Sequence, residues 1–172
     1  MKLKNILMFD VESDGLYGEG FAVGAIVVDC NGMVIDHFEL LSIEGKNNVS
    51  ESFVIDNILP YLTTMEKCNT NLDLRNRFHE FYMKHKDTCK VYSDCNYPVE
   101  TNFLRDVVKD DEENRKWEMP YPLLDVCSVV DVNIDRNSLY EKAIGKVLRK
   151  HHPVDDCLAS IYCFFKYKLE SE

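Results

Sequence analysis

The chain has 172 residues, with 20 Lys and Arg against 30 Asp and Glu, which gives a formal net charge of −10. This acidic balance argues against a broad grip on duplex DNA, because such grips neutralise many phosphates with basic side chains. No run of about 18 apolar residues occurs, so we expect no membrane-spanning segment. The seven cysteines are odd in number and form no close CxxC pairs, which favours reduced thiols and a cytoplasmic protein.

The first part of the chain predicts three antiparallel strands. Residues 5–11 are apolar and end in acidic residues, and residues 21–30 are β-branched and apolar. Asn31-Gly32 is a strong signal for a type I′ hairpin turn, after which residues 33–41 alternate as a returning strand. Ser50 is then predicted to cap a helix that runs towards Leu62.

The second part alternates helices with short extended segments. Spacing of apolar residues and turn signals predict helices over 72–86, 99–108, 138–149 and 154–169, and extended segments over 90–93 and 122–126. The charged stretch 109–116 is predicted to be a solvated loop. The order is that of an α/β fold in one domain, residues 1–172, with a mixed five-stranded sheet, three antiparallel strands first and then parallel strands, flanked by helices.

Acidic residues end the first predicted strand. Asp10 and Glu12 are two positions apart, so both side chains point to the same face of the sheet. The alternative is a solvated strand end. Paired carboxylates next to an apolar strand are costly, however, and perturbed carboxylates cluster at functional sites. The pattern therefore favours a site for a hard cation such as Mg²⁺ or Mn²⁺.

Two later segments add candidates. In the segment HHPVDDC, His151 precedes Asp156 by five residues, and the helix that begins there can carry an acid in its first turn for capping alone. A His before an Asp-bearing helix can also take a proton from water while the Asp holds a metal. In the segment VYSDCNYPVE, Asp94 at a strand end and Glu100 at a helix start compete as a further acid. Each also has an ordinary structural interpretation, as a turn or helix-start residue.

Together the three segments resemble the DEDDh (DnaQ-like) family of 3′-to-5′ exonucleases, in the ribonuclease H-like superfamily. FDVESDGL is similar to the family's first motif, and HHPVDDC to its third, with His151 and Asp156 in register and His152 and Asp155 outside it. The middle motif departs from the pattern, since Asn96 is retained but the family's Asp is Glu100. The third acidic residue is therefore Glu100 by alignment or Asp94 by position.

The resemblance implies hydrolysis with two divalent cations, Mg²⁺ or Mn²⁺, held by Asp10, Glu12 and Asp156 and completed by Asp94 or Glu100. His151 would accept the proton of the attacking water, and nearby carboxylates are expected to raise its pKa. The expected substrates are single-stranded nucleic acid 3′ ends, with RNA slightly favoured over DNA. The alternative is a catalytically impaired nucleotide-binding module on the same fold.

Leu16 and Tyr17 follow the first motif, where an apolar or aromatic wedge could meet the terminal base, and Asn96 is a further candidate for substrate binding. Phe21 opens a strand and is expected to be core. Many relatives in the family are homodimers, so a homodimer is also an expectation.

Overall fold

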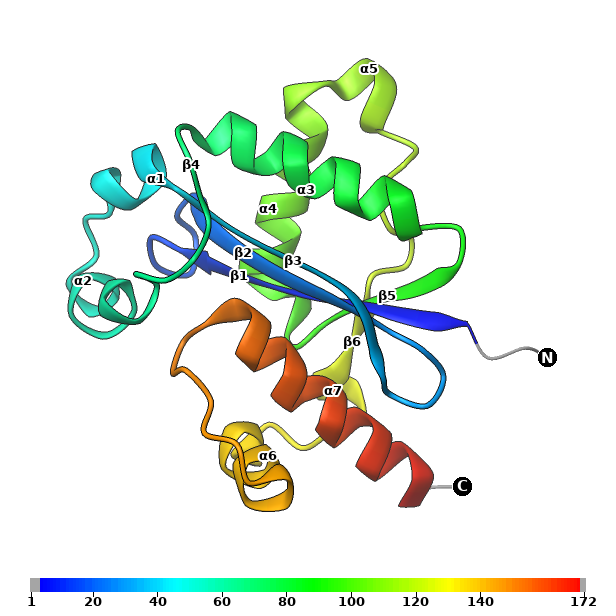
Figure 1. The fold of residues 1–172 in the computed structure, drawn as a ribbon. Coiled ribbons are helices and arrows are strands. Elements are labelled where there is room, and N and C mark those ends of the chain that lie inside the picture. The colour runs from blue at the N-terminus through cyan, green and yellow to red at the C-terminus, as the bar shows by residue number, and fades with distance from the viewer. Residues whose placement is uncertain (1–3, 171–172) are drawn as a thin grey trace.

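A twisted mixed sheet forms the centre of the computed structural model, which describes residues 4–170 and their side chains as far as Tyr167. The strand order is β4-β3-β2-β1-β5-β6 (Figure 1). Strands β1 (Asn5–Ser13), β2 (Gly20–Val28) and β3 (Val34–Ser42) are antiparallel neighbours. Strands β5 (Cys89–Ser93), β6 (Leu124–Asp125) and β4 (Lys67–Cys68) each pair in parallel with a neighbour. The predicted fold class is confirmed, with six strands instead of five because the two-residue β4 is too short to leave a sequence pattern.

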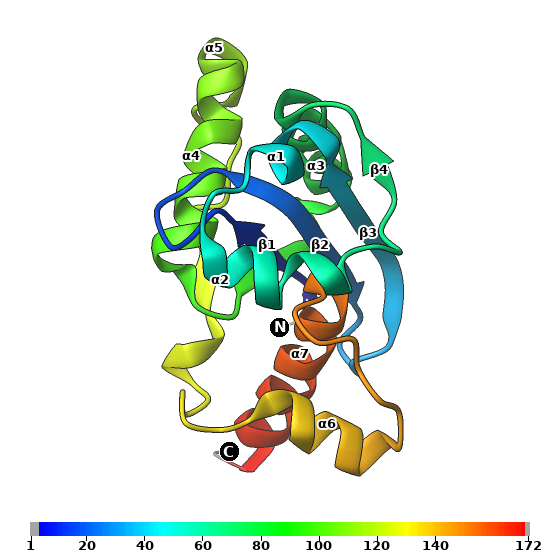
Figure 2. The same cartoon turned by 90° about the vertical axis from the view of Figure 1, so that its left-hand side faces the viewer.

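Helices cover both faces of this sheet. In Figure 1, α3 (Asn71–His85) and α4 (Thr101–Asp110) lie above it, and α6 (Arg136–Ile144) and α7 (Pro153–Glu170) lie below it. Figure 2 looks onto the end of the sheet that carries α1 and α2. The short elements are α1 (Ile43–Asn48), α2 (Ser52–Asn57), η1 (Leu59–Tyr61), η2 (Asn96–Glu100), α5 (Glu112–Arg115) and η3 (Val126–Ser128).

The alternation of β1 divides the core into two layers. Leu7, Phe9 and Val11 belong to the cluster that includes residues of α3 and α4. Ile6 and Met8 belong to the cluster that includes residues of α7. Since side chains alternate between faces along a strand, Asp10 and Glu12 continue the row of Ile6 and Met8 towards α7. The strand therefore carries an apolar row that ends in two carboxylates.

The hairpin prediction was wrong in its turn type. A type I′ turn needs positive φ at both central residues, but of Asn31 and Gly32 only Gly32 has it, at 81°. The turn is closed by the Gly32 N–H, which donates to the Asp29 carbonyl at 3.1 Å, and by the Asp29 N–H, which donates to the Met33 carbonyl at 3.0 Å. The Asp29 carboxylate also accepts the N–H of Met33. The hairpin thus has a three-residue loop with a left-handed glycine.

Three other local predictions also need correction. Ser50 does not cap α2, because its N–H and hydroxyl donate to the Asp14 carboxylate and Glu51 stands at the N-cap. The predicted loop 109–116 is mostly helical, and Arg75 on α3 bonds Asp110 at 2.6 Å within it. The helix predicted over 138–149 ends at Ile144, where Gly145 takes φ 74°.

None of the helices in residues 4–170 has the length and apolar character needed to cross a membrane.

Candidate active site

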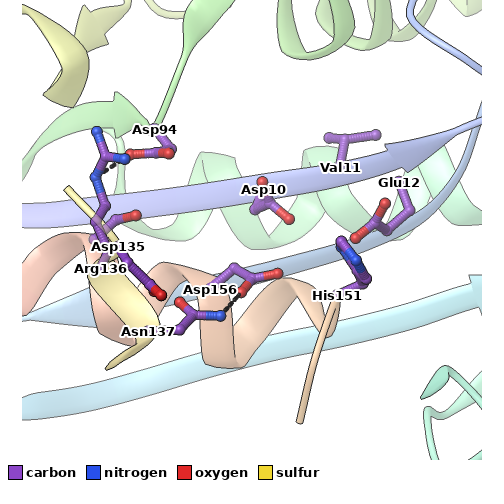
Figure 3. A pocket seen from close by; sticks show the side chains of 10 residues that line it. Asp10, Val11, Glu12, Asp94, Asp135, Arg136, Asn137, His151 and Asp156 are labelled. Atoms are coloured by element: carbon purple, nitrogen blue, oxygen red, sulfur yellow. Dashed lines mark hydrogen bonds and ion pairs between the residues drawn. The ribbon is translucent and has the colours of Figure 1, made fainter. Parts of the chain in front are cut away.

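Three carboxylates from the two ends of the chain meet beside β1. Asp10 and Glu12 extend from the strand, and Asp156 extends from the first turn of α7 (Figure 3). One potential ligand oxygen from each lies within 4.8 Å of the others. The three side chains line a polar pocket of about 330 Å³. The carboxylates named by the first and third motifs are therefore brought together.

A glycine allows this approach. Gly24 of β2 lies directly opposite Asp10 in the antiparallel register. A Cβ at Gly24 would lie 2.5 Å from the backbone N of Val154 and 2.7 Å from Pro153, closer than real Cβ contacts allow. The start of α7 therefore packs directly against the backbone of Gly24. This contact sets the distance between Asp156 and the β1 carboxylates.

The cluster has an excess of negative charge. Burial, with the charges of Glu12 and Asp156, raises the pKa of Asp10 well above its ordinary value. Burial and the charges of Asp156 and Glu100 raise the pKa of Glu12 to about 8. Burial raises the pKa of Asp156 to about 6 although Asn137 donates to it at 2.8 Å. No Lys, Arg or His of the described part of the chain forms an ion pair with Asp10, Glu12 or Asp156.

His151 lies at the rim of the pocket, beside Glu12 (Figure 3). Its backbone is left-handed, with φ 51°, a conformation that few non-glycine residues adopt. The expectation that carboxylates would raise its pKa was wrong: burial, with the positive charge of Lys150, lowers the pKa of the imidazole. His151 is therefore neutral at pH 7.

The neighbouring His152 and Asp155 have other partners. His152 is fully buried, with its Nε2 3.6 Å from Glu39. Asp155 accepts hydrogen bonds from the backbone and guanidinium of Arg149 at 2.7 to 3.0 Å. Of the two His and two Asp residues in the segment, only His151 and Asp156 line the pocket.

Asp94 and Glu100 have different surroundings. Asp94 lines the pocket, but its Oδ1 lies 3.1 Å from Nε of Arg136 (Figure 3). Glu100 is buried and accepts backbone N–H bonds from Val11 and from itself, and burial raises its pKa to about 7. Strand β5 pairs with β1 only as far as Phe9, so the backbone N–H of Val11 has no β5 partner and can donate to Glu100. Asp94 therefore has a cationic partner, whereas no ion pair of the described residues involves Glu100.

Sequence reasoning missed several pocket residues. Arg136 pairs with Asp94, Asn137 bonds Asp156, and Asp135 and Ser160 also line the pocket. Residues 135–137 begin α6, where Asp135 is the N-cap. Nothing in that segment resembles a motif, because its role depends on the packing of α6 against α7.

The three predicted substrate-binding residues lie in two different places. Leu16 and Tyr17 are 64% and 71% exposed and line a second groove with Phe53. Val11 and Glu12 line both this groove and the acidic pocket, so the two hollows adjoin. Asn96 instead bonds within the loops, accepting from Ser93 and donating to the Leu123 carbonyl at 3.1 Å. Phe21 is core, as expected, at 1% exposure.

Comparison with known proteins identifies the fold. No protein-family model and no curated protein matches the sequence. Among solved structures, exonuclease I from Methylocaldum szegediense is 13% identical with a TM-score of 0.62, covering 93% of this chain and 39% of that chain. E. coli exonuclease I in complex with a dA16 oligonucleotide is 13% identical with a TM-score of 0.66, covering 98% and 42%.

E. coli exonuclease I in complex with a 5cy-dT13 oligonucleotide gives a similar result, at 14% identity and a TM-score of 0.65, with 98% of this chain and 41% of that chain covered. The chain spans about two fifths of the length of these proteins. Its architecture is therefore the ribonuclease H-like fold of exonuclease I, at low sequence identity.

Proposed function

We propose that this chain is a metal-dependent 3′-to-5′ exonuclease that releases nucleoside monophosphates from single-stranded DNA. The observation that carries the proposal is the cluster of Asp10, Glu12 and Asp156 with a neutral imidazole, His151, at its rim. The solved structures of similar fold that contain dA16 and dT13 oligonucleotides support single-stranded DNA as the polymer. The RNA preference expected from the sequence has no such support, so RNA becomes the comparison substrate.

The side chains present fit divalent cations. All the donors are carboxylate oxygens, which Mg²⁺ and Mn²⁺ prefer. Burial, followed by the charges of neighbouring carboxylates, raises the pKa of each of the three acids. Two cations held by Asp10, Glu12 and Asp156 would relieve this repulsion and supply Lewis-acid activation of the scissile phosphate and the attacking water.

The protein side chains have separate roles in the proposed reaction. His151 accepts the proton of the attacking water through its neutral form. Glu100 completes the acidic site in preference to Asp94, because Arg136 already compensates the charge of Asp94. Both acids act on the cluster, because the charge of Glu100 raises the pKa of Asp10 and Glu12 and that of Asp94 raises the pKa of Asp10 and Asp156, although only Asp94 lines the pocket.

Substrate recognition is proposed to use the groove that adjoins the acidic pocket. Leu16 and Tyr17 lie along it, exposed and ready to contact the terminal base. The proposal also includes membership of the DEDDh group and a homodimeric state. It further includes a location in the reducing cytoplasm, which the seven free cysteines support.

The test uses the purified chain with 5′-labelled single-stranded DNA and RNA in Mn²⁺, in Mg²⁺ or in chelator. We expect a descending ladder that needs metal, starts from the 3′ end and is faster on DNA. His151→Ala should slow it by roughly 10²- to 10⁴-fold, the usual contribution of a general base. Binding of both polymers without cleavage of either would favour a nucleotide-binding module instead.

A further inference from the structure

Two exposed aromatic rings border His151 on the side of α2 and η1. The ring centroid of His151 lies 6.4 Å from that of Phe53 and 6.4 Å from that of Tyr61. Phe53 is 56% exposed and Tyr61 is 43% exposed, so neither ring is buried in the core. Exposed rings beside a phosphodiester site suit stacking with unpaired bases, which offer a π-face whatever their sequence.

The end of α6 and the loop that leads from it to His151 carry positive charge. Residues 142–150 contain four basic residues and no acidic one, although the chain as a whole has a net charge of −10. Of these, Lys142, Lys146 and Lys150 are exposed, and none forms an ion pair within the described residues. The charge of Lys150 reaches the His151 ring. An acidic protein that holds a polyanion needs such a local basic surface.

This loop is held in place. The buried Leu148 donates its N–H to the Glu141 carboxylate at 2.8 Å. Arg149 is fixed by Asp155 and reaches Thr64, just beyond η1, at 3.4 Å. The lysines on either side of this anchor therefore start from a fixed backbone, which lowers the entropy cost of binding a ligand.

We propose that Phe53, Tyr61, Lys146 and Lys150 form a track for the 5′-ward part of a single polynucleotide strand. The direction rests on the proposed function, since the 3′ end would occupy the acidic pocket. The rings stack on bases and the lysines contact phosphates. Because paired bases cannot stack on protein rings, the track selects single strands and tolerates any sequence.

The test measures binding of a 5′-fluorescein 16-nucleotide oligothymidylate by anisotropy in chelator, over a range of salt concentrations. Lys150→Ala should reduce the slope of log K against log salt by about 0.7, the value for one phosphate contact on a single strand. Tyr61→Ala should weaken binding roughly 5- to 150-fold at fixed salt and leave the slope unchanged. Matched controls are Lys116→Ala and Tyr121→Ala, exposed residues that line neither the acidic pocket nor the adjoining groove.

Variants that bind like their controls, or a wild-type chain that does not bind the oligomer, would overturn the track. A cleavage assay distinguishes failure of the track from failure of the proposed exonuclease function. In the active enzyme, the ratio of kcat/KM for the 16-mer to that for a trinucleotide should fall in Lys150→Ala and Tyr61→Ala, mainly through KM. A chain that binds through these side chains but cleaves nothing would refute the exonuclease and leave the strand-binding surface standing.

Discussion

Replacement of Glu12 by Gln should stabilise the metal-free protein while it removes a metal ligand. The pKa of Glu12 is about 8 in the folded chain against an ordinary 4.5. Between these values the folded state binds more protons than the unfolded state, so stability falls as the pH rises through this window. At pH 7.5, three units above 4.5, the loss reaches up to about 4 kcal/mol at 1.36 kcal/mol per unit.

The assay is thermal unfolding in chelator at pH 5.0 and pH 7.5. Glu12→Gln should raise Tm by on the order of 5–15 °C at pH 7.5, at roughly 2–4 °C per kcal/mol for a chain of this size. The gain should nearly vanish at pH 5.0, where wild-type Glu12 is protonated in the fold. Glu113→Gln, an exposed acid on α5, serves as the control.

Metal should reverse the order of stability. Mn²⁺ should raise the Tm of the wild type at pH 7.5 by neutralising the cluster, and raise that of Glu12→Gln much less. An equal Tm for wild type and Glu12→Gln in chelator at pH 7.5, or the same gain at pH 5.0, would refute the raised pKa of this buried carboxylate.

Three further predictions concern the site. Activity should fall as the pH drops through the lowered pKa of His151, because only the neutral imidazole accepts a proton. Lys150→Ala removes a charge that lowers this pKa, so it should move the acidic limb of the pH profile of kcat to higher pH. A limb that does not move would contradict the effect of the Lys150 charge. Glu100→Gln should reduce Mn²⁺ affinity in calorimetry more than Asp94→Asn, and the reverse order would assign the further ligand to Asp94. Gly24→Ala should displace the start of α7, cost about 1–3 kcal/mol in denaturant unfolding and lower Mn²⁺ affinity, whereas unchanged affinity would show that the contact does not position the site.

Local patterns predicted the fold where they were long. The first two strands are long apolar runs, the third alternates, and α3 and α7 are long enough to show helical spacing, and all five are present close to the expected bounds. Errors fell on short or polar segments. The sequence 109–116 reads as a loop because its helix is supported by contacts with α3, such as Arg75 with Asp110, that no local pattern reveals.

The candidate site divides in the same way. The strand alternation that aligns Asp10 with Glu12, and the five-residue spacing from His151 to Asp156, are properties of the sequence by itself. Only the tertiary structure decided the rest. Arg136 neutralises Asp94, and burial, together with the adjacent Lys150, lowers the pKa of His151 where carboxylates were expected to raise it.

The physical reason is distance along the chain. Periodicity and spacing depend on residues that are close together in the sequence. They were enough to predict the α/β fold and the acids on one face of β1. Charge compensation and close approach depend on which surfaces pack together. Tyr61 came to lie beside His151, and Gly24 beneath Pro153, only because α7 folds back onto the sheet next to α2.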